Sequence, residues 1–207
     1  MAMRARLWAM LLAAATAALP VVAPVLAAGQ RPPVLPLRDV TVEYRVSGRS
    51  FQDIRSVAAR YSVVAQRLRL DTDDQAMGYL LVDPRSRMAR MVVPGLNQYV
   101  ELTLAKDRRA ALLFNDKLGF TRRGATRIAG LPCTLWDVRG GKDTARACIT
   151  DDGVILRAEG TGGDAAGNTL EATRVDFTPQ SEAMFRLPHG SGQLNLQSLL
   201  RGLGRAQ

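Results

Sequence analysis

The chain has 207 residues, a formal net charge of +9 and only 5% aromatic residues. Arginine supplies nearly all of the positive charge, because Lys106, Lys117 and Lys142 are the only lysines. A basic surface favours anionic partners, here an anionic envelope surface of lipid headgroups or lipopolysaccharide. The low aromatic content and the export signal described next argue against a nucleic-acid partner.

The first 28 residues have the pattern of a secretory signal peptide. Arg4 and Arg6 form a positive start, an apolar segment follows, and small residues close it. We expect cleavage after Ala27 or Ala28 and a mature protein in the periplasm. Cleavage would lower the net charge from +9 to about +7 and leave 179 of the 207 residues, enough for a single domain with a core.

An uncleaved membrane anchor is the alternative interpretation, because the apolar residues 7–28 are long enough to span a bilayer. Pro20, Pro24 and the small-residue end favour cleavage. No cysteine follows the apolar segment, so lipid attachment in the manner of bacterial lipoproteins is excluded.

The rest of the chain divides into a proline-rich lead-in (29–39), one β domain (40–190) and a C-terminal helical tail (191–207). Within the β domain, runs that alternate apolar and polar residues recur about every ten residues with turn residues between them, as in antiparallel sheets. The predicted strands are residues 40–46, 57–64, 67–70, 77–82, 87–93, 98–104, 120–128, 131–139, 142–149, 154–159 and 169–177. Residues 106–115 and 194–202 are the predicted helices. We therefore expect a mainly β fold with minor α, in which a curved or barrel-like antiparallel sheet is covered by helix on one face.

A hairpin around Gly140 and Gly141 gives the clearest pairing signal, since glycine tolerates the positive φ of tight turns. Centring the turn on this pair places Cys133 opposite Cys148, within reach of a disulfide. A four-residue loop over residues 139–142 would keep the same pairing, and the sequence does not choose between the two loops. Two unpaired thiols are the alternative to a disulfide.

In the predicted hairpin register, Trp136 lies opposite Ala145. Alternation puts Trp136 on the face opposite the cysteines, and we expect the Trp136 face to be the core side. Large apolar residues of the predicted strands are the candidates for the core or for a groove. These candidates are Val42, Tyr44, Leu68, Leu70, Met91, Tyr99, Trp136 and Phe177.

No catalytic, cofactor-binding or metal-binding cluster is predicted. His189 is the only histidine and lies in a glycine-rich loop, and no serine lies in a G-x-S-x-G elbow. Residues 71–74 resemble the start of a calcium loop, but Ala76 and Val82 stand where the loop needs glycine and glutamate. The cysteines lack redox C-x-x-C spacing. We expect no cofactor and no enzymatic activity.

Two groups of arginines could bind an anion, although outward charges on an exposed sheet face are the simpler interpretation. The groups are Arg122 with Arg123, and Arg85 with Arg87 and Arg90.

A resemblance to known proteins is carried by residues 122–124, 128–134, 136, 147–158, 171–175 and 185–188. Together these segments resemble a family of exported bacterial proteins of unknown function, related in architecture to the outer-membrane lipoprotein carrier and receptor (LolA/LolB-like). This resemblance implies a strongly curved, incomplete antiparallel barrel with helix against its concave apolar face. Lipoprotein carriers shelter acyl chains on that face, which is an analogy of fold and not a residue match.

Two functions remain open. The first is a non-catalytic periplasmic protein that binds lipid, a lipoprotein acyl chain or another apolar ligand in a curved β groove. The alternative is an envelope protein that acts by protein–protein contacts and has a filled core without a ligand. The sequence predicts neither the ligand nor the oligomeric state.

Overall fold

The computed structural model describes residues 31–104 and 117–194. The predicted signal peptide and the helix candidate 106–115 lie outside the described residues, as does the helix candidate 194–202 apart from Leu194. Within the described residues the only helical segments are short 3-10 turns. These are η1 (Arg49–Phe51), η2 (Gln75–Met77), η3 (Pro94–Leu96), η5 (Gly163–Ala165) and η6 (Glu182–Phe185).

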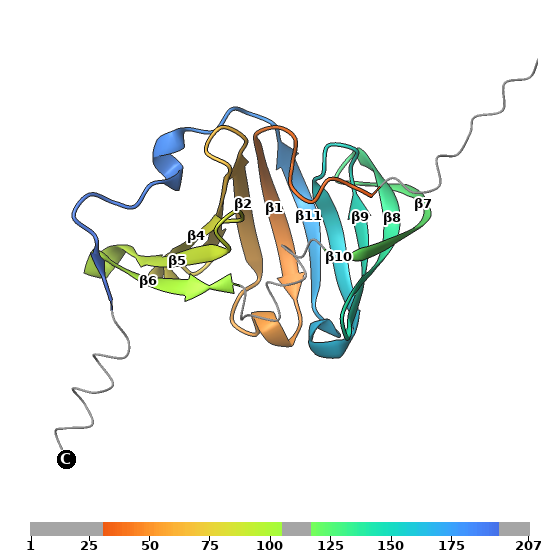
Figure 1. Ribbon diagram of the computed structural model, residues 1–207, viewed down its shortest axis with the longest axis horizontal. Coiled ribbons are helices and arrows are strands. Elements are labelled where there is room, and N and C mark those ends of the chain that lie inside the picture. Colours follow the sequence, from red (N-terminus) through yellow and green to blue (C-terminus); the bar gives the residue numbers. More distant parts are fainter. Residues whose placement is uncertain (1–30, 105–116, 195–207) are drawn as a thin grey trace, which may run out of the picture. The chain divides into compact units, whose positions relative to one another are not determined.

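Twelve strands form one sheet in the described part of the chain (Figure 1). They are β1 (Val40–Ser47), β2 (Ser56–Ser62), β3 (Arg67–Thr72), β4 (Tyr79–Asp83), β5 (Met88–Val93), β6 (Gln98–Thr103), β7 (Gly119–Ile128), β8 (Leu131–Gly140), β9 (Asp143–Ile149), β10 (Ile155–Gly162), β11 (Thr169–Asp176) and β12 (Gly192–Gln193). Their order in the sheet is β12-β6-β5-β4-β3-β2-β1-β11-β10-β9-β8-β7.

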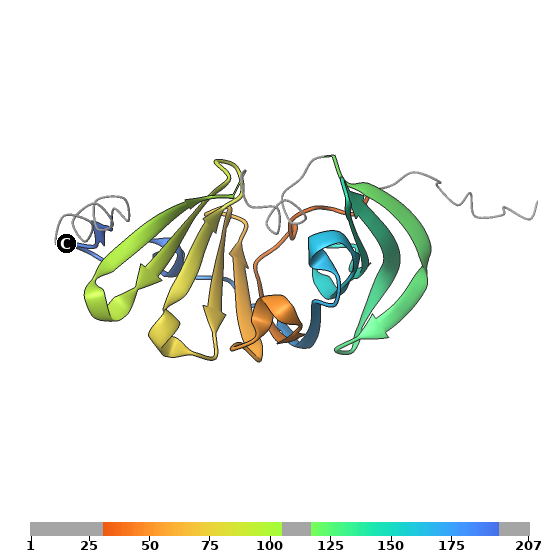
Figure 2. The same ribbon diagram turned by 90° about the horizontal axis from the view of Figure 1, so that it is seen from below.

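The sheet consists of two antiparallel meanders, β1–β6 and β7–β11, that join where β1 pairs with β11. β6 and β7 lie toward opposite ends of the strand order, so the sheet stays open. Figure 2 shows its curvature. The predicted mainly β fold with one curved antiparallel sheet is therefore confirmed.

The pairing of β1 with β11 forms a seam between the two meanders. A bulge interrupts the register between Glu43 and Tyr44, where Thr173 is the extra residue on β11. The Thr173 hydroxyl donates a hydrogen bond to the Glu43 carbonyl at 3.0 Å. The Tyr44 hydroxyl donates one to the Ile155 carbonyl of β10 at 2.6 Å, which ties the first meander to the second.

The β8–β9 hairpin turns one residue later than the sequence predicts. Gly140 pairs with Asp143, so Gly141 and Lys142 alone form the turn. Gly141 has a φ of 64°, and Lys142 is not among the residues with positive φ, as in a type II′ turn. Only one of the two glycines is needed for the turn, and Gly140 ends β8 as a paired residue. Both predicted loops, the Gly140–Gly141 turn and the four-residue loop, are therefore wrong.

The predicted hairpin register is consequently wrong by two residues. Cys148 pairs with Leu135, and Trp136 pairs with Ala147. A shift of two residues keeps every side chain on its face, so the cysteines still share one face. The structure joins Cys133 and Cys148 diagonally in a disulfide, with their Cα atoms 5.4 Å apart.

The Trp136 face of this hairpin is buried in a core, as expected, and the cysteine face is buried as well around the disulfide. Trp136 packs with Val138, Ala147 and Ile149 in one cluster. The two cysteines belong to another cluster that also contains core residues of β1, β2, β10 and β11. The disulfide thus lies inside the core that spans the seam.

The proline-rich lead-in contacts both meanders. The Arg38 guanidinium pairs with Asp152 at 2.6 Å and lies 3.6 Å from the centre of the Phe177 ring. The Asp39 carboxylate accepts hydrogen bonds from the backbone N–H groups of Val63 at 2.8 Å and Gln180 at 2.6 Å. The lead-in is therefore part of the folded domain.

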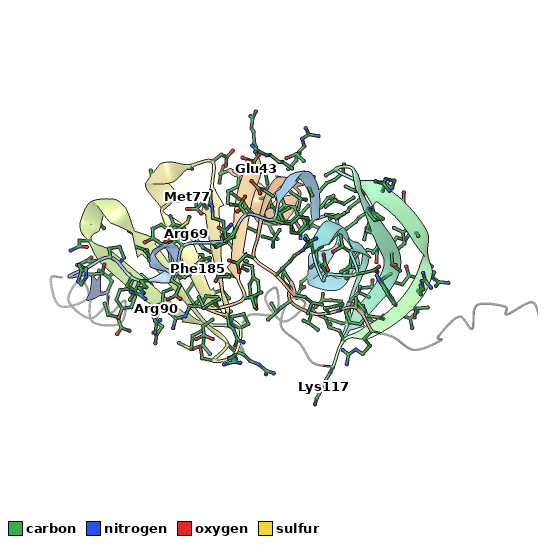
Figure 3. All side chains as sticks on the ribbon, turned by 90° about the horizontal axis from the view of Figure 1, so that it is seen from above. Glu43, Arg69, Met77, Arg90, Lys117 and Phe185 are labelled. Carbon is green, nitrogen blue, oxygen red and sulfur yellow. A yellow bond between two sulfur atoms is a disulfide. The ribbon has the colours of Figure 1, made fainter. Side chains whose placement is uncertain are left out.

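Residues 178–193, which we call the strap, run from β11 back to the β6 edge. The Phe185 side chain is only 1% exposed. Arg67 donates a hydrogen bond to the Phe185 carbonyl at 3.3 Å, and Arg69 donates one to the Met184 carbonyl at 3.2 Å. Figure 3 shows Arg69, Phe185 and Arg90 in one region. The strap ends in β12, which pairs in parallel with β6.

Removing the disulfide should lower stability. The chain-entropy model assigns about 3 kcal/mol to a link between residues 15 apart. The Cys133→Ala/Cys148→Ala variant should therefore unfold in urea with a free energy lower by about this amount. A reductant should destabilise the wild type to the same level and leave the variant unchanged. Equal midpoints for oxidised and reduced wild type would contradict the expectation.

Phe185 should anchor the strap. Truncation of a fully buried phenylalanine costs about 3–5 kcal/mol, so Phe185→Ala should lower the free energy of unfolding by that order. Leu37, which is 63% exposed, is the control, and Leu37→Ala should change stability by less than about 0.5 kcal/mol. Similar effects of both substitutions in urea unfolding would show that the strap contributes little.

Candidate functional site

An apolar row crosses the first meander from β1 to β6 and is the best-defined candidate surface. Strand pairing aligns one residue from each strand, so these side chains point to the same face. The row is Val42, Ala59, Leu70, Leu80, Met91 and Val100. We call the side of β1–β6 that carries this row the apolar face.

A second apolar row lies next to the first on the same face. It consists of Val40, Tyr61, Leu68, Val82, Ala89 and Leu102. Near the β4–β5 turn this second row is closely packed, because Val82 and Ala89 form a cluster with Leu104 and are 2% and 0% exposed. In the first row only Val42 is fully buried, and the other five side chains are half-buried.

Exposure of the apolar face rises toward β6. Leu102 on β6 is 41% exposed, whereas its neighbour Ala89 in the row is fully buried. A row of half-buried apolar side chains without a charge can bind an apolar group by excluding water from it.

The other side of the same strands carries the charges. Arg60 and Arg69 pair with Asp71 at 2.5 and 2.8 Å, and Arg90 pairs with Glu101 at 3.1 Å. Arg69 also lies 3.7 Å from the centre of the Tyr79 ring. The strap covers part of this charged side, where Leu81 and Val92 are buried beside the charged residues. The two faces of the first meander therefore differ in where they carry charge.

The structure places five of the eight predicted core or groove residues on the apolar face. Val42, Leu70 and Met91 lie in the first row, and Leu68 lies in the second. Tyr44 lies two residues beyond Val42 along β1, opposite Val57. Its hydroxyl bonds to Ile155 as described, and burial raises the pKa of the Tyr44 phenol.

The other three predicted residues lie elsewhere. Tyr99 pairs with Val92 and therefore points to the charged side of the first meander. Trp136 lies in the cluster of the second meander, and Phe177 packs against the seam core beneath Arg38. Sequence reasoning missed Ala59, Leu80, Val100 and Leu102, although each occupies an apolar position of an alternating strand.

A separate hollow of about 480 Å³ lies on the surface near the seam bulge. It is lined by Tyr44, Arg45, Val46, Arg55, Ser56 and Thr173. Arg45, Arg55, Ser56 and Thr173 are all exposed. No histidine, cysteine or carboxylate lines this hollow, so its walls offer no nucleophile with a partner base.

The chemistry-bearing residues singled out in the sequence lie in separate places, His189 in the strap and residues 71–74 at the end of β3. Residues 31–104 and 117–194 contain no group of three histidine, cysteine or acidic residues placed to hold a metal. His189 is exposed in the strap. The calcium-like segment is a turn in which Asp74 accepts a hydrogen bond from the Ala76 N–H at 2.9 Å, while Asp71 pairs with arginines.

None of the described segments forms a helix of the length and apolarity needed to cross a membrane. The described part defines a class of fold: an open, curved antiparallel sheet with one apolar and one charged face over its first meander. No protein family description matches the chain, and no curated protein matches it.

Solved structures provide the remaining comparison. The chain is 12% identical to an uncharacterised conserved protein of Thermus thermophilus, with a TM-score of 0.52 over 76% of this chain and 91% of that one. Its identity to PNGF-II is 10%, with a TM-score of 0.50 over 82% and 34% of the two chains. For MucB in the MucA/MucB complex of Pseudomonas aeruginosa, the identity is 13% and the TM-score 0.48, over 72% and 56%.

This chain therefore spans about a third of PNGF-II and a little over half of MucB. At such identities the Thermus protein and PNGF-II support the fold alone, and the MucB match is too distant for any argument. The relation to the LolA/LolB-like family stays a prediction from the sequence.

The hydrogen bond from Tyr44 to Ile155 should stabilise the seam. Tyr44→Phe would leave the carbonyl without this donor, so the free energy of unfolding should fall by about 1 kcal/mol. Tyr79→Phe, on the charged side of β4, is the control and should have a smaller effect. Urea unfolding measures both variants, and an unchanged Tyr44→Phe would argue against the bond.

Proposed function

We propose that the protein is a non-catalytic periplasmic binding protein that holds a lipid or lipoprotein acyl chain, or a comparably apolar ligand, on its apolar face. The observation that carries the proposal is the first row, which presents five half-buried apolar side chains on neighbouring strands. The predicted signal peptide and the Cys133–Cys148 disulfide support export to an oxidising compartment.

The dimensions of the row suit an extended ligand. Neighbouring strands lie about 4.8 Å apart, so six strands give the row a length of about 24 Å. Each methylene group removed from water contributes about 0.8 kcal/mol, so an acyl chain along the row could bind through apolar contacts alone. The row offers no charged group, and we therefore expect weak discrimination between chains of similar length.

A protein partner without a ligand is the second candidate function. The packing of Val82 and Ala89 against Leu104 favours it, because this end of the apolar face is already filled by the chain itself. A partner would then cover the exposed side chains near β6, above all Leu102.

Charge placed on the apolar face should weaken ligand binding. Protein purified from the periplasm would be examined by native mass spectrometry and titrated with a fluorescent fatty acid. Met91→Glu and Leu102→Glu should each weaken binding at least about tenfold, since burying a carboxylate against an acyl chain is costly. Val64→Glu, at a position that is 76% exposed in the β2–β3 turn, should bind like the wild type.

Leu102→Glu is the milder substitution, because Leu102 is already 41% exposed and the variant should keep its fold by circular dichroism. A clean mass without lipid, no binding of the fatty acid and recovery of a stable protein partner would favour the second candidate. Equal affinity in all three variants would overturn the ligand proposal.

A further inference from the structure

The two edges of the sheet differ in what covers them. At one edge the strap covers β6: Gly192 and Gln193 pair in parallel with Gln98 and Tyr99, and the Leu194 N–H bonds to the Tyr99 carbonyl at 2.8 Å. At the other edge, β7 has β8 as its one strand neighbour among the described residues. In an antiparallel edge strand, alternate residues direct their backbone N–H and C=O groups away from the sheet.

β7 is a long edge strand of ten residues, and most of its side chains are exposed. Gly124 is open, with no atom within 4 Å of where a Cβ would lie. At the start of β7, the lead-in approaches: Arg31 bonds to the Leu118 carbonyl at 2.8 Å and lies 5.5 Å from the centre of the Phe120 ring. The accessible stretch is therefore Arg122 to Ile128.

This stretch is basic. It carries Arg122, Arg123 and Arg127 and no acidic residue. Arg123 is paired with Asp137 of β8 at 2.7 Å, and Arg127 donates to the Gly130 carbonyl at 2.6 Å. No acid in the described part of the chain pairs with Arg122. An added strand would thus meet excess positive charge along the β7 edge.

The positive charge of the β7 edge distinguishes between the segments that could pair with it. A second copy of β7 would bring the same arginines together, and like charges on facing strands are destabilising. Residues 1–30 and 195–207 contain no acidic residue, and residues 105–116 contain three basic and two acidic residues. None of these segments carries a net negative charge that would complement the basic β7 edge.

We propose that the β7 edge is a docking site for an extended, acidic segment of another protein, which adds to the sheet as a thirteenth strand. Backbone hydrogen bonds to residues 124–128 provide the pairing, and acidic side chains of the partner face Arg122 and Arg127. The same arginines that prevent edge-to-edge self-association select the charge of the partner.

A synthetic peptide that alternates glutamate and threonine tests the proposal on the mature protein. We expect it to bind, and hydrogen exchange should show protection at alternate amides within residues 124–128. The Arg122→Glu/Arg127→Glu variant should lose at least about tenfold in affinity for this peptide. It should gain affinity for a peptide in which lysine replaces glutamate.

Three controls make the result decisive. Arg45→Glu/Arg174→Glu changes the net charge equally on interior strands β1 and β11 and should bind the glutamate peptide like the wild type. Circular dichroism checks that both double variants are folded. A peptide alternating glutamate and proline has the same charge but cannot form a strand and should not bind.

Equal binding of the glutamate–proline peptide, equal loss in the two double variants, or protection on strands other than β7 would overturn the proposal. So would the absence of binding by the glutamate–threonine peptide. Binding of a fatty acid to the apolar face is independent of all these outcomes.

Discussion

The structure depends on the pairing of β1 with β11. Each meander is assembled from local hairpins, but neither can complete the core without the other, because the largest cluster draws on both. Val40 and Val42 from β1 pack with Leu156 and Ala172 from the second meander. Pairing strands from opposite ends of the domain requires a large loop to close before these contacts form, so we expect the seam to form late in folding.

The separation of apolar and charged side chains onto two sides of the first meander follows from the same pairing. Once register is fixed by the seam and the hairpins, alternation sorts Leu70, Leu80 and Met91 to one side of the first meander and Arg60, Arg69 and Asp71 to the other. On the charged side, ion pairs and the strap satisfy most of the polar groups. On the apolar side, close packing closes the end near Leu104 and also the β1–β2 end, where Val40, Val42 and Tyr61 belong to the seam core.

Strand positions and the mainly β class could be predicted from alternation and turn residues, since both are local properties. The β8–β9 faces were also predictable, but the register was not, because nothing in the Gly140–Gly141 pair tells which glycine takes the positive φ. Half of the first row could be predicted in the same way. Val42, Leu70 and Met91 were recognised as large apolar strand residues, and the structure aligns them in one row.

Tyr99 and Trp136 show why the rest of the site could not be predicted. Both are large and apolar, but Tyr99 pairs with Val92 and so points to the charged side, whereas Trp136 lies in a cluster of the second meander. That information resides in pairings between strands and in bulges such as the one at Glu43 and Tyr44. Small residues such as Ala59 were overlooked because their contribution appears only once the row is assembled.

The disulfide has a consequence for how the protein matures. The chain contains two cysteines, and both are used in the Cys133–Cys148 link. A single molecule therefore has no incorrect internal pairing to escape from, and the partners are only 15 positions apart on adjacent strands. An oxidant alone should suffice for maturation, without the isomerase that proteins with several interchangeable bridges require.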